Sequence, residues 1–344
     1  MQVKYLSPEE DCSVWNAYVL AHPKGTAAHM AAWGRAVYKS MGHPLYFMYV
    51  EQGGRIRGLL PLVHVKSRLF GNALLSMAFS TYGGPLADDD EVLALLDEEC
   101  ARLSVKLKVD YVELRNMDQA HADWPCKDSL YSTFRKELSP DNEDNMKAIP
   151  RKQRAMVRKG IKARLRAEID ETVDRLYALY AESVRNLGTP VFPKSLFWQM
   201  KEQFGKDCEI LTVCTEDGQA LSSVMSIYFR DEVFPYYGGG TVAARHYAAN
   251  DFMYWSVMAR AVAERQCRIF DFGRSKNGTG AFNFKKYWGF EPRPLQYEYY
   301  LREGQQIPDI NPLNPKYQLM IRTWRKLPLP VANLLGPMIS RSLG

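Results

Sequence analysis

The internal order of the chain constrains its fold more than any single motif does, because one series of elements occurs twice. In each half, a helix that carries a tryptophan precedes two strands around a glycine-containing turn, a Tyr-Gly-Gly loop, a second helix and a further strand. The first half is predicted to contain a helix at 27–39, strands at 44–51 and 57–66, a loop at 82–85, a helix at 88–108 and a strand at 109–114. The second half is predicted to contain a helix at 195–204, strands at 209–215 and 220–230, a loop at 237–240, a helix at 250–265, which Asn250 or Asp251 is expected to cap, and a strand at 268–272. With each pair of strands counted as one hairpin, five elements recur in one order, which favours a duplicated α/β domain.

Each repeat combines an antiparallel hairpin with a strand–helix–strand crossover, which predicts a mixed sheet with helices on its faces. A further helix at 281–288 and a Tyr-rich strand at 295–301 follow the second repeat. We therefore expect mixed α+β sheets in two similar units. The expected boundaries are 1–145 for the first domain, 146–166 for a basic linker helix, 167–305 for the second domain and 306–344 for a basic, Pro-rich tail.

Composition and missing motifs exclude several classes of protein. With 46% hydrophobic and 24% charged residues, the chain can bury a core. Its cysteines form no C-x-x-C pair, its histidines are dispersed, and H-E-x-x-H, G-x-x-x-x-G-K-[ST] and G-x-S-x-G do not occur. We therefore expect no metal site and no serine-hydrolase chemistry. The N-terminus does not resemble a signal peptide and no apolar run approaches about 18 residues, so we expect a cytoplasmic protein without a transmembrane segment.

The linker is the most biased segment of the chain. Residues 147–166 contain nine Lys or Arg and no Asp or Glu. One interpretation is a solvated surface helix. The other is a binding surface for a polyanion, because like charges this dense repel one another.

The tail is also basic. Residues 316–344 contain five Lys or Arg and no acidic residue, and Pro328, Pro330 and Pro337 interrupt its apolar stretch. Since proline breaks a continuous amphipathic helix, we expect a tail that wraps and docks on the protein surface. A contact with a membrane interface is the alternative.

The densest group of unusual residues lies at 270–290. A predicted strand ends there in Asp271 and Arg274, a glycine-containing loop follows, and a short helix carries Lys285. Such a loop can hold an anion at the start of the helix. The structural interpretation is that Gly289 is a helix C-cap and that the aromatic residues belong to the core.

A series of residues in the second repeat can be compared with known families. It consists of Tyr237, Gly238, Gly239, Gly240, Arg245, Asn250, Trp255, Asp271, Phe272, Gly273, Arg274, Ser275, Phe284, Lys285, Gly289 and Phe290. The series resembles the acetyltransferase-like domain of the Fem family, and more closely the FemAB-like proteins associated with exosortase and PEP-CTERM systems of bacteria. The resemblance covers roughly residues 3–302. It implies two GNAT-like domains; characterised Fem members attach amino acids from aminoacyl-tRNA to a peptidoglycan precursor.

The resemblance also implies roles for individual residues. In the Fem family, a Lys after a Phe in the final helix lies in the donor channel, which assigns a catalytic role to Lys285. An ammonium there would stabilise the charge that forms on a carbonyl oxygen when an amine attacks an ester, and Arg274 is expected to assist. The predicted substrate contacts are Tyr237, Arg245, Asn250, Asp271 and Phe284 on the donor side, and Tyr82 and Arg35 on the acceptor side in the first domain.

The donor is left open. The loop at 241–249 corresponds to the Q/R-x-x-G-x-G/A loop that holds the CoA pyrophosphate in GNAT enzymes, but it contains no glycine. The long coiled-coil arm of some Fem proteins is also missing from the second domain. Acyl-CoA and aminoacyl-tRNA both remain candidate donor substrates, and no cofactor is assigned.

We therefore predict a metal-independent transferase that moves an acyl or aminoacyl group onto an amine of a cell-envelope or exopolysaccharide precursor. Its expected partners are an anionic or lipid-linked precursor and tRNA, but not DNA, with peripheral contact at the inner membrane left open. The alternative is a non-catalytic GNAT-like module that binds an anionic glycan or nucleic acid. An intact Lys285 protected in a cleft favours the enzyme.

Overall fold

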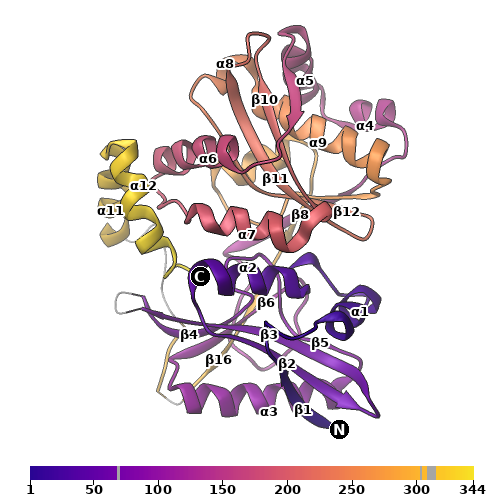
Figure 1. The fold of residues 1–344 in the computed structure, drawn as a ribbon, viewed down its shortest axis with the longest axis vertical. Coiled ribbons are helices and arrows are strands. Elements are labelled where there is room, and N and C mark those ends of the chain that lie inside the picture. The colour runs from indigo at the N-terminus through magenta and orange to yellow at the C-terminus, as the bar shows by residue number, and fades with distance from the viewer. Residues whose placement is uncertain (68–69, 303, 308–314) are drawn as a thin grey trace. The chain divides into compact units, whose positions relative to one another are not determined.

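The computed structural model describes residues 1–67, 70–302, 304–307 and 315–344. The chain divides into two compact units (Figure 1). Unit 1 contains Met1–Leu130, Pro294–Ile310 and Arg341–Gly344, and unit 2 contains Tyr131–Arg293 and Asn311–Ser340. Each unit has its own mixed sheet, so the predicted fold class of two α/β units is confirmed.

Unit 1 is built on a sheet in the order β1-β2-β3-β4-β6-β16-β7, with β5 paired to β3. Strands β4 and β6 are parallel and are connected through α3, whereas the other pairs are antiparallel. Helix α3 begins where Asp89 accepts a hydrogen bond from the backbone N–H of Val92, and it buries Val92, Leu96 and Leu103 against the sheet. The strands are β1 (Gln2–Leu6), β2 (Leu45–Gln52), β3 (Arg55–Ser67), β4 (Gly71–Ser76), β5 (Leu86–Ala87), β6 (Tyr111–Asn116), β7 (Cys126–Lys127) and β16 (Gln296–Leu301), and the helices are α1 (Ser13–Ala21), η1 (Ala27–His29), α2 (Ala31–Met41) and α3 (Asp90–Leu107).

Unit 2 is built on a sheet in the order β14-β8-β13-β12-β11-β10-β9, with β15 paired to β8. Its strands are β8 (Tyr131–Glu137), β9 (Arg166–Ile169), β10 (Cys208–Cys214), β11 (Ala220–Phe229), β12 (Glu232–Gly240), β13 (Ile269–Asp271), β14 (Ser275–Lys276) and β15 (Pro292–Pro294). Its helices are α4 (Asn142–Ala148), α5 (Arg151–Lys162), α6 (Asp174–Leu187), α7 (Lys194–Phe204), η2 (Gly205–Asp207), α8 (Ala244–Tyr247), α9 (Ala249–Arg265), α10 (Gly280–Tyr287), α11 (Pro315–Lys326) and α12 (Leu329–Ser340).

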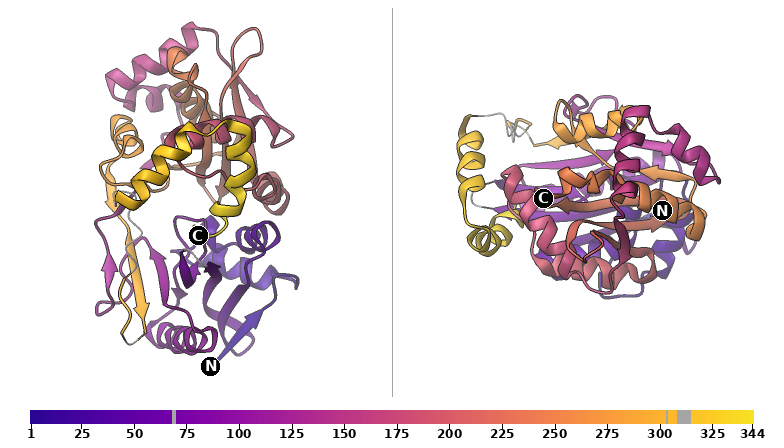
Figure 2. Two further views of the ribbon diagram at one scale, coloured as in Figure 1. Left: turned by 90° about the vertical axis from the view of Figure 1, so that its left-hand side faces the viewer. Right: turned by 90° about the horizontal axis from the view of Figure 1, so that it is seen from above.

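Helices cover both faces of the second sheet. Successive side chains of a strand point to opposite faces. Leu211 and Val213 of β10 accordingly join the core under α9 and α5, whereas Thr212 between them donates to Asp170, in the connection between β9 and α6. Helices α11 and α12 pack outside α6, on the side away from the sheet (Figures 1 and 2).

The units differ from the expected domain boundaries because the two repeats exchange one strand each. Strand β16 follows the second repeat in sequence but pairs with β6 and β7 in unit 1. Strand β8 follows the first repeat but pairs with β13 and β14 in unit 2. The boundary therefore falls at Leu130 and not at 145, and 294–305 belongs with unit 1 and not with the second domain.

Two basic segments also differ from expectation. The segment 146–166, predicted as one linker helix, instead forms the end of α4, all of α5 and the start of β9. The helix is interrupted at Ile149, whose backbone is extended because it precedes Pro150. The tail does not simply wrap the surface, since it forms the two helices α11 and α12 (Figure 2). Pro330 lies in the first turn of α12. A backbone N–H in this turn has no intrahelical acceptor, so a proline there loses no hydrogen bond. Residues 308–314 of the tail lie outside the described residues.

Candidate active site

The second sheet opens between β12 and β13. These parallel strands pair only at Glu232–Ile269 and Val233–Phe270, although β12 continues to Gly240. A pocket of about 400 Å³ lies beyond the last pair. Its wall combines the glycine end of β12, the second half of α6, the first turns of α9, and residues from the loop after β13 and from α10.

The glycines of β12 allow α6 to approach the sheet. A Cβ atom on Gly239 would lie 2.7 Å from the Cα of Tyr180 and 2.9 Å from the carbonyl oxygen of Leu179, both in α6. No side chain fits there. The prediction of a loop at 237–240 was wrong, because these glycines serve close packing within a strand and not a turn.

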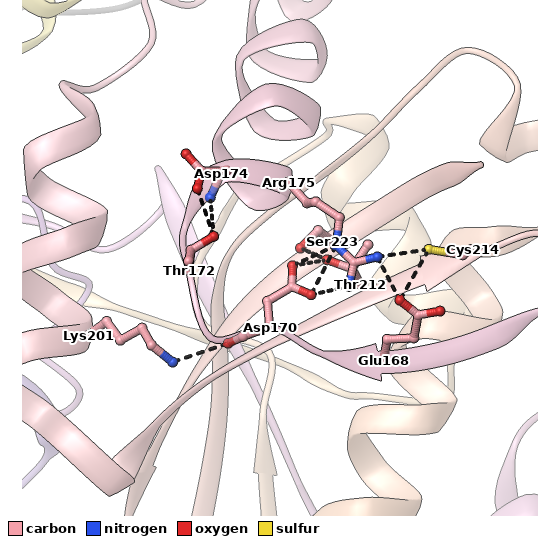
Figure 3. A network of polar contacts seen from close by, with 9 residues as sticks. All are labelled: Glu168, Asp170, Thr172, Asp174, Arg175, Lys201, Thr212, Cys214 and Ser223. Carbon is pink, nitrogen blue, oxygen red and sulfur yellow. Dashed lines mark hydrogen bonds and ion pairs between the residues drawn. The ribbon is translucent and has the colours of Figure 1, made fainter. Parts of the chain in front are cut away.

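The start of α6 is fixed by a polar network (Figure 3). The Arg175 guanidinium donates to the buried Asp170 carboxylate at 3.0 and 3.2 Å and to Glu168 at 2.6 Å. Thr212 of β10 donates to the same Asp170 carboxylate at 2.8 Å. The hydrogen bond with Asp170 contributes most to raising the pKa of Arg175. The network ties α6 to β9 and β10, and so orients the opposite end of α6 at the pocket.

Four uncharged polar side chains line the pocket without a role in the described fold. Ser183 and Asn186 come from α6, and Asn250 and Tyr254 come from α9. Within the described part of the chain, the side-chain polar atoms of these four residues have no hydrogen-bond partner, and burial raises the pKa of Tyr254 to about 12. They are therefore available to a bound molecule.

Lys285 lies in the wall of this pocket. Its Nζ atom donates to the carbonyl oxygens of Phe272 at 2.6 Å, Gly273 at 3.0 Å and Arg274 at 3.0 Å. Burial lowers the pKa of Lys285 to about 7; the charge of Asp271 opposes this shift and that of Arg274 adds to it. The three carbonyls accept all three protons of the ammonium, so the side chain holds the turn after β13 and places a titratable charge beside the pocket.

Asp271 helps to form the same turn. Its carboxylate is buried, accepts a hydrogen bond from the backbone N–H of Gly273 at 2.7 Å and lies 3.7 Å from the guanidinium of Arg135. Gly273 has a φ of 63°, which a residue without a side chain adopts at little cost. The observed partners of Asp271 are thus protein groups.

Other predicted site residues fall into two groups. Arg245, Asn250, Phe284 and Lys285 are brought together in the pocket wall. Tyr237 and Arg274 are not among the lining residues. The buried ring of Tyr237 packs edge-on against Tyr180, Phe197 and other rings of an aromatic cluster. The Arg274 guanidinium lies over the ring of Tyr131, 4.7 Å from its centroid.

The predicted acceptor residues Arg35 and Tyr82 belong to unit 1. The Arg35 guanidinium donates to the carbonyl oxygens of Pro8, at 2.7 Å, and Glu10, and Tyr82 is buried. Neither lines the pocket in unit 2, and their contact with an acceptor stays a prediction.

The loop between β12 and α9 contains α8. The backbone N–H groups of Ala244, His246 and Ala248 donate within this loop, to Thr241, Ala243 and Arg245. The helix α9 starts after Ala248, which has a φ of 55°, so the predicted capping by Asn250 or Asp251 was wrong. Asp251 instead accepts hydrogen bonds from Gln153 of α5 and, at 3.1 Å, from Trp288.

The sequence did not identify Ser183, Asn186 or Tyr254 as site residues. No motif marks α6, and only its packing on Gly239 brings Ser183 and Asn186 to the pocket. Tyr254 could have been found from its spacing, because it lies one helical turn after Asn250.

Among the described residues, no group of three His, Cys, Asp or Glu could hold a metal ion, and no helix is long and apolar enough to cross a membrane.

Known proteins share this architecture. A family model described as an acetyltransferase (GNAT) domain matches residues 144–286. Among solved structures, FemX is 16% identical over 93% of this chain and 100% of its own, with a TM-score of 0.68. A tandem GNAT protein from the clavulanic acid biosynthesis pathway is 12% identical over 89% and 99% of the two chains, with a TM-score of 0.56.

The fold is that of a tandem GNAT protein. L-PGS from Bacillus licheniformis is also similar, with 12% identity over 94% of this chain and 100% of its own and a TM-score of 0.58. No curated protein matches the sequence. The chain thus has the predicted GNAT-type fold and is similar in fold to FemX, while the relation to the exosortase-associated branch stays a prediction.

Proposed function

We propose that the chain is an acyl- or aminoacyltransferase whose unit 2 holds the activated donor in the pocket where β12 and β13 separate. One observation carries the proposal: the polar atoms of Ser183, Asn186, Asn250 and Tyr254, which have no partner among the described residues, lie beside a lysine whose pKa is lowered to about 7. Among the described residues, the folded protein supplies no hydrogen-bond partner for these polar atoms. A bound substrate would supply one.

The chemistry that fits this pocket is direct transfer. The nitrogen of an acceptor amine bonds to the donor carbonyl carbon, the carbonyl–oxygen or carbonyl–sulfur bond breaks, and the proton of the amine passes to the leaving group. The Lys285 ammonium stabilises the developing oxyanion chiefly through its charge, because its protons are donated to the turn after β13. Phe272 and Phe284 limit the access of water, which strengthens the electrostatic interaction between the ammonium and the oxyanion.

The loop with α8 favours a donor other than acyl-CoA. The backbone N–H groups of Ala244, Arg245, His246 and Ala248 are bonded within the loop. The loop also contains no glycine, so side chains crowd the backbone where a pyrophosphate would lie. An aminoacyl ester on tRNA is the donor we propose, with an amine of a cell-envelope or exopolysaccharide precursor as acceptor. The similarity in fold to FemX and the basic surface of α5 support this choice.

Mass spectrometry of molecules that co-purify with the protein would test the donor most directly. In a second experiment, the protein is incubated with radiolabelled aminoacyl-tRNA or with radiolabelled acetyl-CoA, and retained label is measured on filters. We expect retention of aminoacyl-tRNA, weakened about tenfold by Asn250→Ala or Tyr254→Phe without a change in Tm, because a lost hydrogen bond costs about 1.4 kcal/mol. Retention of acetyl-CoA alone would contradict the tRNA donor, and retention of neither would contradict a donor site.

A non-catalytic binding module is the second candidate. It is favoured by one observation, namely that all three donor positions of Lys285 are occupied by backbone carbonyls. Such a lysine could have a purely structural role. Binding of aminoacyl-tRNA with no release of the amino acid to any amine would favour the module over the enzyme.

A further inference from the structure

Helix α12 is packed with its small residues inward and its large residues outward. Ala332, Gly336 and Ser340 are buried, at intervals of four residues. On the outer face, Leu334 is 73% exposed and Met338 is 69% exposed. A surface helix of a globular protein normally buries its large apolar side chains, so the outer face of α12 is the reverse of the usual arrangement.

This orientation is fixed by close contacts. A Cβ atom on Gly336 would lie 2.9 Å from the backbone nitrogen of Val191, and Ser340 donates to the carbonyl oxygen of Val191 at 2.9 Å. In α11, Arg325 donates to the carbonyl oxygen of Leu187 at 3.2 Å. The inward face therefore cannot take larger side chains, and α12 cannot turn its leucines inward without breaking this packing.

The charge of the two helices indicates what covers the outer face. Residues 315–344 contain Lys316, Arg322, Arg325, Lys326 and Arg341 and no Asp or Glu. The outer face continues onto α11, where Leu319 is 69% exposed. A second copy of the chain would bring like charges together. An anionic lipid surface attracts the basic residues and takes up the exposed apolar ones.

We propose that α11 and α12 form a peripheral docking surface for an anionic lipid bilayer. Their outer apolar side chains enter the interface while the exposed Arg322 and Lys326 of α11 contact lipid phosphates. Figure 2 shows the two helices together at the left of its right-hand panel. Both helices are 12 residues long, which suits a contact in the plane of the interface and not a span.

The docking surface is next to the pocket. Helices α11 and α12 pack on α6, and Asn186 and Leu187 at the end of α6 line the pocket. Leu187 is itself 61% exposed. A docked protein would therefore present the pocket close to the lipid surface, and the acceptor of the proposed transfer would be a lipid-linked amine; this last step rests on the proposed function.

Sedimentation with vesicles tests the docking itself. The full chain is mixed with vesicles of phosphatidylcholine alone or with about one third phosphatidylglycerol. We expect binding to the anionic vesicles, weakened about tenfold or more by the variant Leu334→Gln/Met338→Gln and about fivefold per charge by Arg322→Gln and Lys326→Gln. The matched control is Val14→Gln/Val105→Gln, which removes two exposed apolar side chains of unit 1, 60% and 64% exposed, and should bind like the wild type.

The outcomes separate docking from catalysis. Vesicle binding needs neither donor nor acceptor, so loss of the transferase hypothesis leaves this result unchanged. Absence of binding by the wild type, or equal binding by Leu334→Gln/Met338→Gln, overturns the proposal. A wild-type dimer that this variant converts to a monomer, without vesicle binding by either, overturns it in favour of a contact between two copies of the chain.

Discussion

The ammonium of Lys285 lies 2.6 Å from the carbonyl oxygen of Phe272, and it also holds the next two carbonyls of the turn. The neighbouring Lys286 is exposed. Adjacent helix positions point about 100° apart, so the two lysines of α10 provide a matched pair. Their environments differ while their position in the chain is almost the same.

We expect Lys285→Met to lower transfer about a hundredfold or more, because the charge beside the reacting carbonyl is lost. The variant should also lose about 1–3 kcal/mol of stability, since three carbonyls lose their donor. Lys286→Met should change neither quantity. Transfer rates and thermal unfolding of both variants are the measurements; equal activity of the two would remove Lys285 from the reaction and leave it a role in the turn.

Much of this site could be anticipated from the sequence, because it depends on local order. The element order predicted both hairpins and both crossovers, and the resemblance of the second repeat pointed to Arg245, Asn250, Phe284 and Lys285, which do meet in one pocket. These residues lie on α8, α9 and α10, whose positions follow from the crossover after β12.

The remainder depends on contacts between distant parts of the chain. The exchange of β8 and β16 depends on which sheet each strand pairs with. The residue pattern of a strand would be the same in either unit, so the sequence does not identify its partner strand. The glycines at the end of β12 suggested a turn because glycine is common in turns, but their role is visible only once α6 lies on them.

A pH-dependent contribution to stability is expected in unit 1. His121 bonds through Nδ1 to the buried Glu298 at 2.9 Å and through Nε2 to Asp97 at 3.0 Å. Burial opposes the charge on His121, but the hydrogen bonds and charges of Asp97 and Glu298 outweigh it and raise the pKa of His121 to about 9. The folded state thus binds the proton more tightly than the unfolded state, whose histidine has a pKa of about 6.5.

The stability that His121 gains from Asp97 and Glu298 is complete below about pH 6.5 and is lost as the pH rises through about 9. We expect the free energy of unfolding of the wild type to exceed that of His121→Gln by a margin that falls by about 3 kcal/mol between these pH values. Denaturant unfolding of both proteins from pH 6 to pH 10 measures the margin. A margin that stays constant over this range would show that folding does not raise the pKa of His121.

The close packing of α6 on β12 predicts the effect of one methyl group. Gly239→Ala would place a Cβ atom 2.7 Å from the Cα of Tyr180, and backbone cannot give way as a side chain can. We expect a loss of about 1–3 kcal/mol and weaker donor binding, because α6 carries Ser183 and Asn186. Gly280→Ala is the control, since no atom lies within 4 Å of its added methyl group. Equal stability of the two variants would mean that α6 shifts freely on the sheet.

The basic face of α5 predicts binding of a polyanion. Its buried residues are Gln153, Val157 and Gly160, and the opposite face has a shallow concave surface lined by Arg151, Arg154, Ala155, Arg158, Lys159 and Lys162. In the described residues, no carboxylate forms an ion pair with Arg158, Lys159 or Lys162. Charges that are dense and unpaired on a helix fixed at its other face are available to phosphates.

We expect tRNA to bind this face with an affinity that falls steeply with salt. Replacing Arg158, Lys159 and Lys162 by Glu should weaken binding and reduce the slope of log K against log salt by about 0.7–0.9 for each phosphate that these residues no longer neutralise. The control variant replaces the exposed Lys39, Arg55 and Lys66 of unit 1 by Glu, which changes the net charge equally. If both variants weaken tRNA binding to the same extent, the attraction comes from the net charge of the protein alone. If tRNA binds with no salt dependence, α5 is a solvated surface helix, and the donor reaches the pocket by other contacts.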